Sequence, residues 1–148
     1  MVIKQVILAF FGSIFPVILF NIDRKKIIWT GFSGAIGWAA YLIVYKYIHS
    51  PAMSSFVGAF MVGVYSELMA RKLKTPAMQF SIPGIFPLVP GITAYYAINS
   101  IVEQNYNLAY SKGLQTIAVG GAIAFGIMLS STTIRFIAKI IYNSRNKH

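Results

Sequence analysis

The sequence has no cysteine, only three acidic residues and only two histidines among its 148 residues. Without cysteine the chain can form neither a disulfide nor a thiolate nucleophile. The two histidines are His49 and the C-terminal His148, which leaves no cluster with the usual spacing of metal ligands. We therefore predict no metal site and no cofactor.

The motifs of common enzymes are also missing. The sequence contains no Gly-x-Ser-x-Gly elbow, no His-Glu-x-x-His motif and no P-loop. The three acids are Asp23, Glu67 and Glu103. If the apolar segments cross a membrane in turn, Asp23 lies in the first cytoplasmic loop and Glu103 at the opposite face, so neither can pair with Glu67 and we expect no catalytic carboxylate pair. These absences predict that the protein is not an enzyme.

Charged residues are scarce, at 11% of the chain, whereas 57% of the residues are hydrophobic. A soluble domain carries about a quarter charged residues, so this composition indicates a membrane protein. The net charge of +10 comes from short basic clusters between long apolar runs. Because no basic face with interleaved aromatics is present, we expect contact with anionic lipid headgroups and no binding of nucleic acid.

Five apolar segments are each long enough to cross a bilayer. They lie near residues 2–21, 27–47, 52–70, 78–102 and 114–142. The first resembles a signal peptide but ends in NIDRKK without a small-residue cleavage site, so we interpret it as a membrane helix. We predict an all-α polytopic protein with about five transmembrane helices, in which residues 1–148 form a single integral membrane domain.

The Lys and Arg residues alternate in number between successive connections. Ten of the 13 would fall on one side of the membrane if all five segments cross. By the positive-inside rule, this side is the cytoplasm. We therefore predict an external N-terminus and a cytoplasmic C-terminus.

The fourth segment contains the run IPGIFPLVPGITAYY, from Ile82 to Tyr96. Its prolines lack N–H groups and disfavour a continuous α-helix, so we expect unpaired carbonyls there. We predict an irregular entry over Ile82 to Pro90, with Pro83, Gly84 and Pro87 forming the structural break. A helix from Gly91 to Val102 would then complete the crossing; the alternative is a re-entrant loop.

Polar residues follow this break and suggest a substrate site. A half helix that begins at Gly91 would direct free N–H groups toward the middle of the membrane, where they could receive a carboxylate. The candidate substrate-binding residues are Pro90, Gly91, Thr93, Tyr95 and Asn99. In the alternative interpretation, Tyr95 belongs to an interfacial aromatic belt and Asn99 forms a hydrogen bond between helices.

Glu67 is the one acid well inside an apolar segment. Acids in membrane spans usually face a cavity or a partner, so Glu67 is our candidate for proton coupling. The alternative is a simple ion pair with Arg71, four residues later. We further expect small residues of two segments to allow close helix packing: Gly31, Gly34 and Gly37 in the second segment, and Gly120, Gly121 and Ala124 in the last.

Hydroxyl groups are concentrated in the last segment. Ser130, Ser131, Thr132 and Thr133 form a continuous run. In a membrane span, such side chains usually bond back to the carbonyls of their own helix. We expect the same here.

The run FPLVPGITAY, preceded by IPG, resembles the signature of the threonine/serine exporter family, specifically its small membrane-only subunit. The Gly-rich second segment (GFSGAIGW) and the third segment closing in ELMARKLK fit the same pattern. The residues that match the motif are Pro83, Gly84, Pro87, Pro90, Gly91, Ala94 and Tyr95.

This resemblance implies a multi-pass protein of the bacterial inner membrane. It implies an exporter of threonine and serine, or of dicarboxylates such as succinate, that the proton motive force drives. It also implies a larger subunit of the same family as partner. Two other hypotheses stay open: a scaffold subunit that carries no substrate, and a homo-oligomeric channel.

Overall fold

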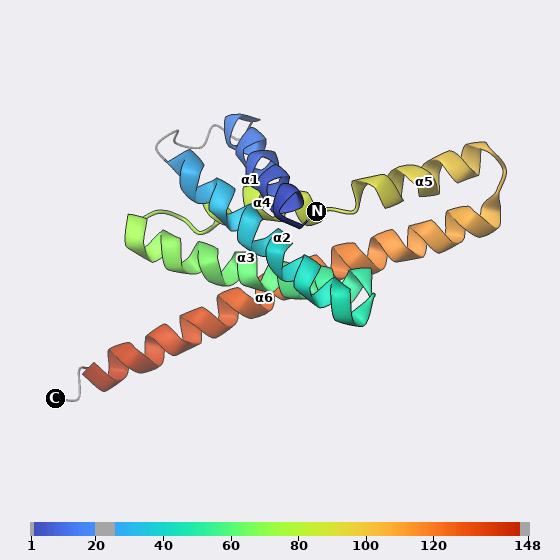
Figure 1. The fold of residues 1–148 in the computed structure, drawn as a ribbon. Coiled ribbons are helices and arrows are strands. Elements are labelled where there is room, and N and C mark those ends of the chain that lie inside the picture. The colour runs from blue at the N-terminus through green and yellow to red at the C-terminus, as the bar shows by residue number, and fades with distance from the viewer. Residues whose placement is uncertain (1, 20–25, 146–148) are drawn as a thin grey trace.

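The computed structural model describes residues 2–19 and 26–145, and it is helical almost throughout (Figure 1). Within these residues no strand is found, which confirms the all-α prediction. The elements are α1 (Val2–Leu19), α2 (Ile27–Ile48), α3 (Pro51–Leu73), α4 (Met78–Ile85), the 3₁₀ helix η2 (Phe86–Leu88), α5 (Gly91–Val102) and α6 (Tyr106–Arg145). The predicted basic loop at Asp23, Arg24 and Lys25 lies outside the described residues, as do residues 146–148.

The helix ends follow local chemistry. α2 ends where His49 adopts a left-handed conformation (φ 55°), and α3 then begins with Pro51 in its first turn, where the missing N–H costs nothing. α3 closes on a second left-handed residue, Lys74. Arg71 and Lys72 in its last turn complement the negative end of the helix dipole.

Four helices are long and apolar enough to span a membrane: α1, α2, α3 and α6. A fifth span results if the α4–η2 segment and α5 are counted together, with a bend of 53° between them. A re-entrant loop must reverse its direction, whereas a bend of this size keeps both halves heading the same way. The bend therefore favours a broken span.

Glycines bring the helix backbones together. A Cβ at Gly58 would lie 2.8 Å from the Gly37 carbonyl oxygen, so α2 and α3 cross here in backbone contact. A Cβ at Gly126 of α6 would lie 2.6 Å from the Phe56 carbonyl oxygen of α3. In lipid the hydrophobic effect does not hold helices together, so close van der Waals contacts such as these stabilise the bundle instead.

The expected role of Gly120 and Gly121 in close packing is wrong for contacts within this chain. A Cβ added at either position would meet nothing within 4 Å. Gly126, one and a half turns further along α6, is the residue that meets α3. α3 and α6 therefore cross nearer to the basic end of α6 than the prediction for Gly120 and Gly121 indicated.

α5 and the first part of α6 form an arm beside the bundle of α1 to α4 (Figure 1). Within the described chain, α5 packs mainly against α6. The 40 residues of α6 give it a length of about 60 Å, twice the hydrocarbon thickness of a bilayer. α6 therefore extends past the bundle at both ends.

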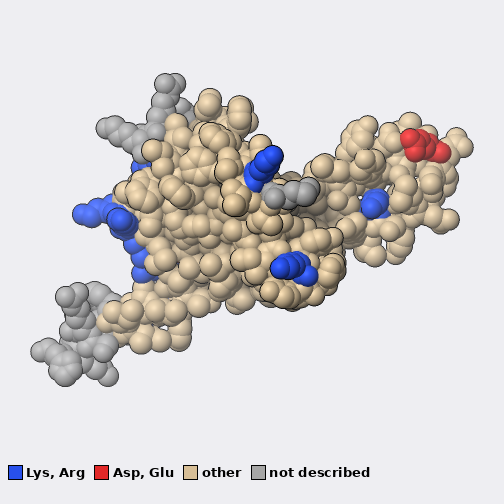
Figure 2. Space-filling view, viewed as in Figure 1, with Lys and Arg blue, Asp and Glu red and all other residues tan. Residues whose placement is uncertain are grey.

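The cations are distributed unevenly (Figure 2). Lys and Arg side chains gather at the left of the view, where α2 begins and α3 ends, while isolated cations lie elsewhere. The acidic side chain at the tip of the arm belongs to the turn that follows α5, where Glu103 lies. One end of the bundle is therefore strongly basic.

Candidate functional site

The break in the fourth segment is shorter than predicted. α4 stays helical through Pro83 to Ile85, so the expectation that irregular backbone begins at Ile82 is wrong. Pro83 lies in the second turn, where only one carbonyl of the preceding chain loses its α-helical donor. Irregular geometry is confined to residues 86–90.

The expectation of unpaired carbonyls at the break is also wrong for the two carbonyls that Pro87 and Pro90 affect. The Phe86 N–H donates to the Pro83 carbonyl. The Val89 N–H donates to the Phe86 carbonyl at 3.3 Å, and the Gly91 N–H donates to the Val89 carbonyl at 2.8 Å. The 3₁₀ turn thus supplies new donors in place of those that proline lacks.

The break lies near the middle of the apolar part of α6. A cavity of about 390 Å³ separates the two, with Val89 and Pro90 on one side and Gly120, Ile123 and Ala124 on the other. Along α6, Ile123 is eleven residues from Lys112 and twelve from Arg135, about 17 Å from each. The chain therefore changes direction beside the middle of the uncharged stretch of α6.

The predicted substrate residues do not converge on one point. Pro90 lines the cavity beside α6, and Gly91 opens α5 with no neighbour within 4 Å of a Cβ. Thr93 is partly exposed, and Tyr95 is 64% exposed with its ring against Tyr96. Farther along, the Asn99 side-chain amide donates to the Glu103 carboxylate at 2.7 Å, so the prediction that Asn99 bonds to another helix is wrong for the contacts of this donor within the chain.

Three further residues of the motif face into the bundle of α1 to α4. Pro83 and Gly84 are buried, and a Cβ at Gly84 would overlap the Ser33 hydroxyl of α2. Pro87 lines a second cavity, on the opposite side of the break from α6. The motif therefore serves close packing as well as the bend.

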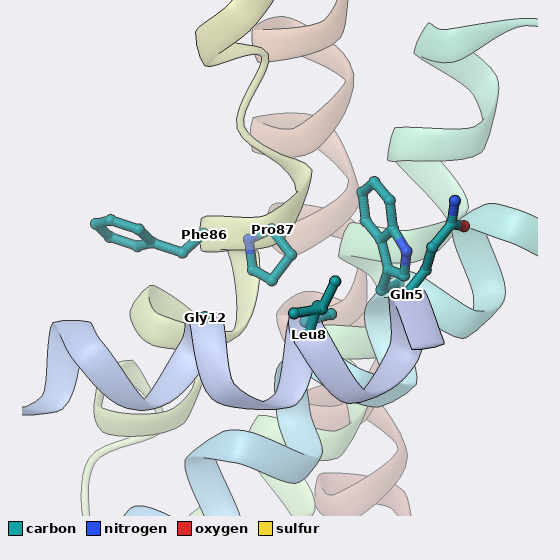
Figure 3. Close-up of a pocket in the computed structure, with 7 residues that line it drawn as sticks. Gln5, Leu8, Gly12, Phe86 and Pro87 are labelled. Atoms are coloured by element: carbon teal, nitrogen blue, oxygen red, sulfur yellow. The ribbon is translucent and has the colours of Figure 1, made fainter. Parts of the chain in front are cut away.

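This second cavity has a volume of about 410 Å³ and lies between α1, α2 and η2 (Figure 3). Its lining residues are Gln5, Leu8, Ala9, Gly12, Trp38, Phe86 and Pro87. In Figure 3, Gln5, Leu8 and Gly12 follow one another along α1, and Pro87 lies opposite the stretch between Leu8 and Gly12. The sequence interpretation missed Gln5 and Trp38, although Gln5 is an amide near the start of the first apolar segment.

Glu67 connects two helices. Its carboxylate lies 3.4 Å from the Arg135 Nε of α6, and its side chain is 8% exposed, against 73% for Arg135. The alternative pairing with Arg71 is not formed; Arg71 donates instead to the Ile134 carbonyl of α6 at 3.3 Å. Both contacts lie at the basic end of the bundle, about 18 Å along α6 from the break.

The hydroxyl groups of α6 bond back to the carbonyls of their own helix, as predicted, at the positions where a hydrogen bond is found. Ser130, Thr132 and Thr133 donate to the carbonyls of Ile127, Met128 and Leu129 of the same helix at 2.8 Å. Across the described ranges, no group of three or more potential ligands could hold a metal ion.

Four long apolar helices, together with a pair of shorter helices bent by 53° between two cavities, define a multi-pass membrane protein. Discontinuous helices of this kind are found in transporters. The chain belongs to the threonine/serine exporter (ThrE) family, whose model matches residues 5–133. This confirms the resemblance inferred from the Pro-Gly motif, and with it a multi-pass protein of the bacterial cell membrane.

A threonine/serine exporter of Corynebacterium glutamicum is 24% identical over 113 residues. The match covers 76% of this chain and 23% of that relative, so the chain spans about a quarter of the relative's length. No solved structure matches the chain.

Proposed function

We propose that this chain is the membrane subunit of a secondary exporter of small amino or organic acids. Threonine and serine are the first candidates, and succinate-like dicarboxylates come next. The exporter works with a larger subunit of the same family and is driven by the proton motive force. The observation that supports this function best is the helix break beside the middle of the uncharged stretch of α6, in a chain of an exporter family.

The break supplies features that a carboxylate can use. α5 starts at Gly91, where an added Cβ would meet nothing within 4 Å. The Gly91 N–H donates to the Val89 carbonyl, so the donors that a carboxylate could use are the next N–H groups of the first turn, which have no acceptor within the helix. The helix dipole adds positive potential at the same place. Pro90, Gly91 and Thr93 lie nearest to this end, whereas Tyr95 and Asn99 would act farther along the path.

Glu67 is the proposed proton-coupling group. It is nearly buried, and the cations that face it are Arg135 from α6 and, on its own helix, Arg71, which is engaged with α6. Protonation would remove the charge that holds Arg135 and loosen one contact between α3 and α6. Loss of this contact would ease the rocking that alternating access requires.

A scaffold without substrate contact is the second candidate. It is favoured by the local pairing of polar groups after the break: Asn99 bonds to Glu103, and the Ser100 hydroxyl donates to the Tyr96 carbonyl. In that case this chain would only position its partner.

Efflux of labelled threonine, serine and succinate tests these functions. The assay uses cells that lack both subunits, complemented with this chain alone, with the larger subunit alone, or with both. We expect efflux only with both chains. Efflux with this chain alone would indicate a homo-oligomeric channel, and undiminished efflux with the larger subunit alone would show that transport does not require this chain.

The double substitution Pro90→Ala, Gly91→Ala tests the site in the same assay. Alanine at both positions favours a straighter helix through the break. We expect efflux to be lost while the chain still inserts and associates with its partner. Normal efflux from this variant would show that the break is not part of the site.

A further inference from the structure

The cavity between α1, α2 and η2 has an almost wholly apolar lining. None of its lining residues that the structure describes is charged, and only Gln5 and Trp38 have polar side-chain atoms. The Trp38 indole Nε1 is itself buried in the protein, so the ring borders the cavity with carbon atoms. The Gln5 amide is therefore the one side-chain group of this lining that can form hydrogen bonds with an occupant.

The cavity is open on the side of α1 that is exposed to the surroundings. Leu8 and Phe86 both line it, yet they are 69% and 44% exposed. Phe11 and Phe15 follow Leu8 at helical spacing on the same face of α1 and are exposed as well. In a membrane this apolar face meets hydrocarbon, so a molecule can enter the cavity sideways from the bilayer.

The lining excludes water and charged solutes as occupants. A buried water needs roughly two to four polar partners, which one amide does not supply. A charged solute would lose its hydration without compensation, and an empty cavity would leave the lining without van der Waals contacts. An apolar chain avoids all three costs. The volume of about 410 Å³ equals that of roughly a dozen waters at ~30 Å³ each, and a methylene group is of similar size, so a segment of an acyl chain fits.

The polar groups at one end of the cavity match a lipid headgroup. Lys4 is exposed, precedes Gln5 directly and is the last charged residue before the uncharged remainder of α1. From Gln5 to Gly12, α1 rises by about 10 Å, less than the ~15 Å of one hydrocarbon leaflet. Pro87 lies opposite the stretch that ends at Gly12 (Figure 3). The cavity therefore lies within one leaflet, with a cation at its outer end and the helix break farther in.

We propose that this cavity binds one acyl chain of a phospholipid from the leaflet at the N-terminal end of α1. The chain lies beside Gly12 and contacts the Trp38 ring and Pro87. The Gln5 amide donates to the ester carbonyl of the lipid, and the Lys4 ammonium group donates to its phosphate. The bound chain fills the space between α1 and η2 next to the break. This site does not depend on the proposed export function.

Quenching of Trp38 fluorescence by brominated lipid measures whether the site is occupied. The chain has two tryptophans, and Trp29 lies in the first turn of α2, with Lys72 Nζ 5.5 Å from its ring centroid. In the Trp29→Phe variant, purified and reconstituted into phosphatidylglycerol vesicles, Trp38 is the sole tryptophan. Because bromine quenches at short range, we expect phosphatidylglycerol with brominated acyl chains to quench the emission of Trp38.

Gly12→Leu distinguishes a chain in the cavity from the lipid around the protein. A Cβ at Gly12 meets nothing within 4 Å, so a leucine side chain would occupy the cavity without a clash. We expect Gly12→Leu to reduce the quenching of Trp38 at least twofold, and Gly12→Ala, the matched control, to retain most of it. In the Trp38→Phe background, where Trp29 reports on the other end of α2, neither substitution should change the quenching.

Lys4→Gln tests the headgroup end of the site and leaves the cavity as it is. The quenching of Trp38 is measured in mixed vesicles in which either phosphatidylglycerol or phosphatidylcholine carries the bromine. We expect the parent protein to prefer phosphatidylglycerol and Lys4→Gln to weaken this preference about fivefold, as the loss of one cation near an anionic headgroup predicts.

Three results would overturn the lipid site. The first is equal quenching of Trp38 with and without Gly12→Leu, because the quenching lipid would then lie outside the cavity. The second is quenching of Trp38 by aqueous iodide and not by brominated lipid, because the cavity would then hold water. The third is loss of the lipid quenching in the assembled complex with the larger subunit, which would assign the cavity to a segment of that subunit.

Discussion

At the scale of single residues, the glycines of α6 lie in two different environments: one is packed against another helix and one is exposed. Gly126 lies in backbone contact with α3, whereas Gly121 is exposed and meets nothing within 4 Å. The two are five residues apart in the same helix, so helix propensity treats them alike. Their difference comes from tertiary contact alone.

Alanine substitution at these two positions should therefore have opposite effects. Gly126→Ala forces a methyl group against the Phe56 carbonyl and should destabilise the chain by about 1–3 kcal/mol. Gly121→Ala should be neutral or stabilise it by up to about 1 kcal/mol, because alanine is the better helix former. Thermal unfolding in detergent measures both, and equal melting temperatures for the two variants would contradict the α3–α6 contact.

At the scale of elements, the pair of Glu67 and Arg135 joins α3 to α6. Arg135 is 73% exposed, and a pair that water reaches on one side contributes about 0–1 kcal/mol. A contact this weak cannot hold the two helices together by itself. The charge of Glu67 is therefore better suited to shifting the relative position of α3 and α6 than to stabilising the fold.

The Glu67→Gln substitution tests that role. Glutamine has the shape of protonated glutamate and cannot release a proton, so we expect intact assembly but an efflux that depends less on pH than in the wild type. The measurement is the ratio of efflux rates at two external pH values. Glu103→Gln is the matched control, because Glu103 lies at the tip of the arm. A purely structural Glu67 would lower efflux equally at both pH values.

The elements could be predicted from the sequence to different degrees. The apolar runs predict the helices because hydropathy is a local property, and the Pro-Gly motif predicts the bend. The 3₁₀ turn gives the carbonyls of Pro83 and Phe86 new N–H donors. This pairing could not be predicted, because it depends on how the chain turns between packed helices. Trp38 and Gln5 were missed for a similar reason: they lie on different helices and line one cavity only because these helices pack together.

At the scale of the whole molecule, the distribution of charge and the bend between α4 and α5 both support the predicted orientation in the membrane, with the C-terminus in the cytoplasm. The basic residues gather at one end of the bundle, and the arm carries Glu103 away from it (Figure 2). The 53° bend lets the α4–α5 segment cross, which would place Ser111 and Lys72 on opposite sides of the membrane. A re-entrant segment would place them on the same side.

The absence of cysteine makes this orientation measurable with single substitutions. Ser111→Cys and Lys72→Cys each introduce one thiol at an exposed position in a chain that has no other. By the positive-inside rule, we expect a membrane-impermeant maleimide to label Ser111→Cys in intact cells, and Lys72→Cys only after permeabilisation. The unsubstituted chain, which should remain unlabelled in both conditions, is the control. If both variants were labelled only after permeabilisation, the broken segment would return to the side from which it entered, and the site at its break would have to open toward the cytoplasm alone.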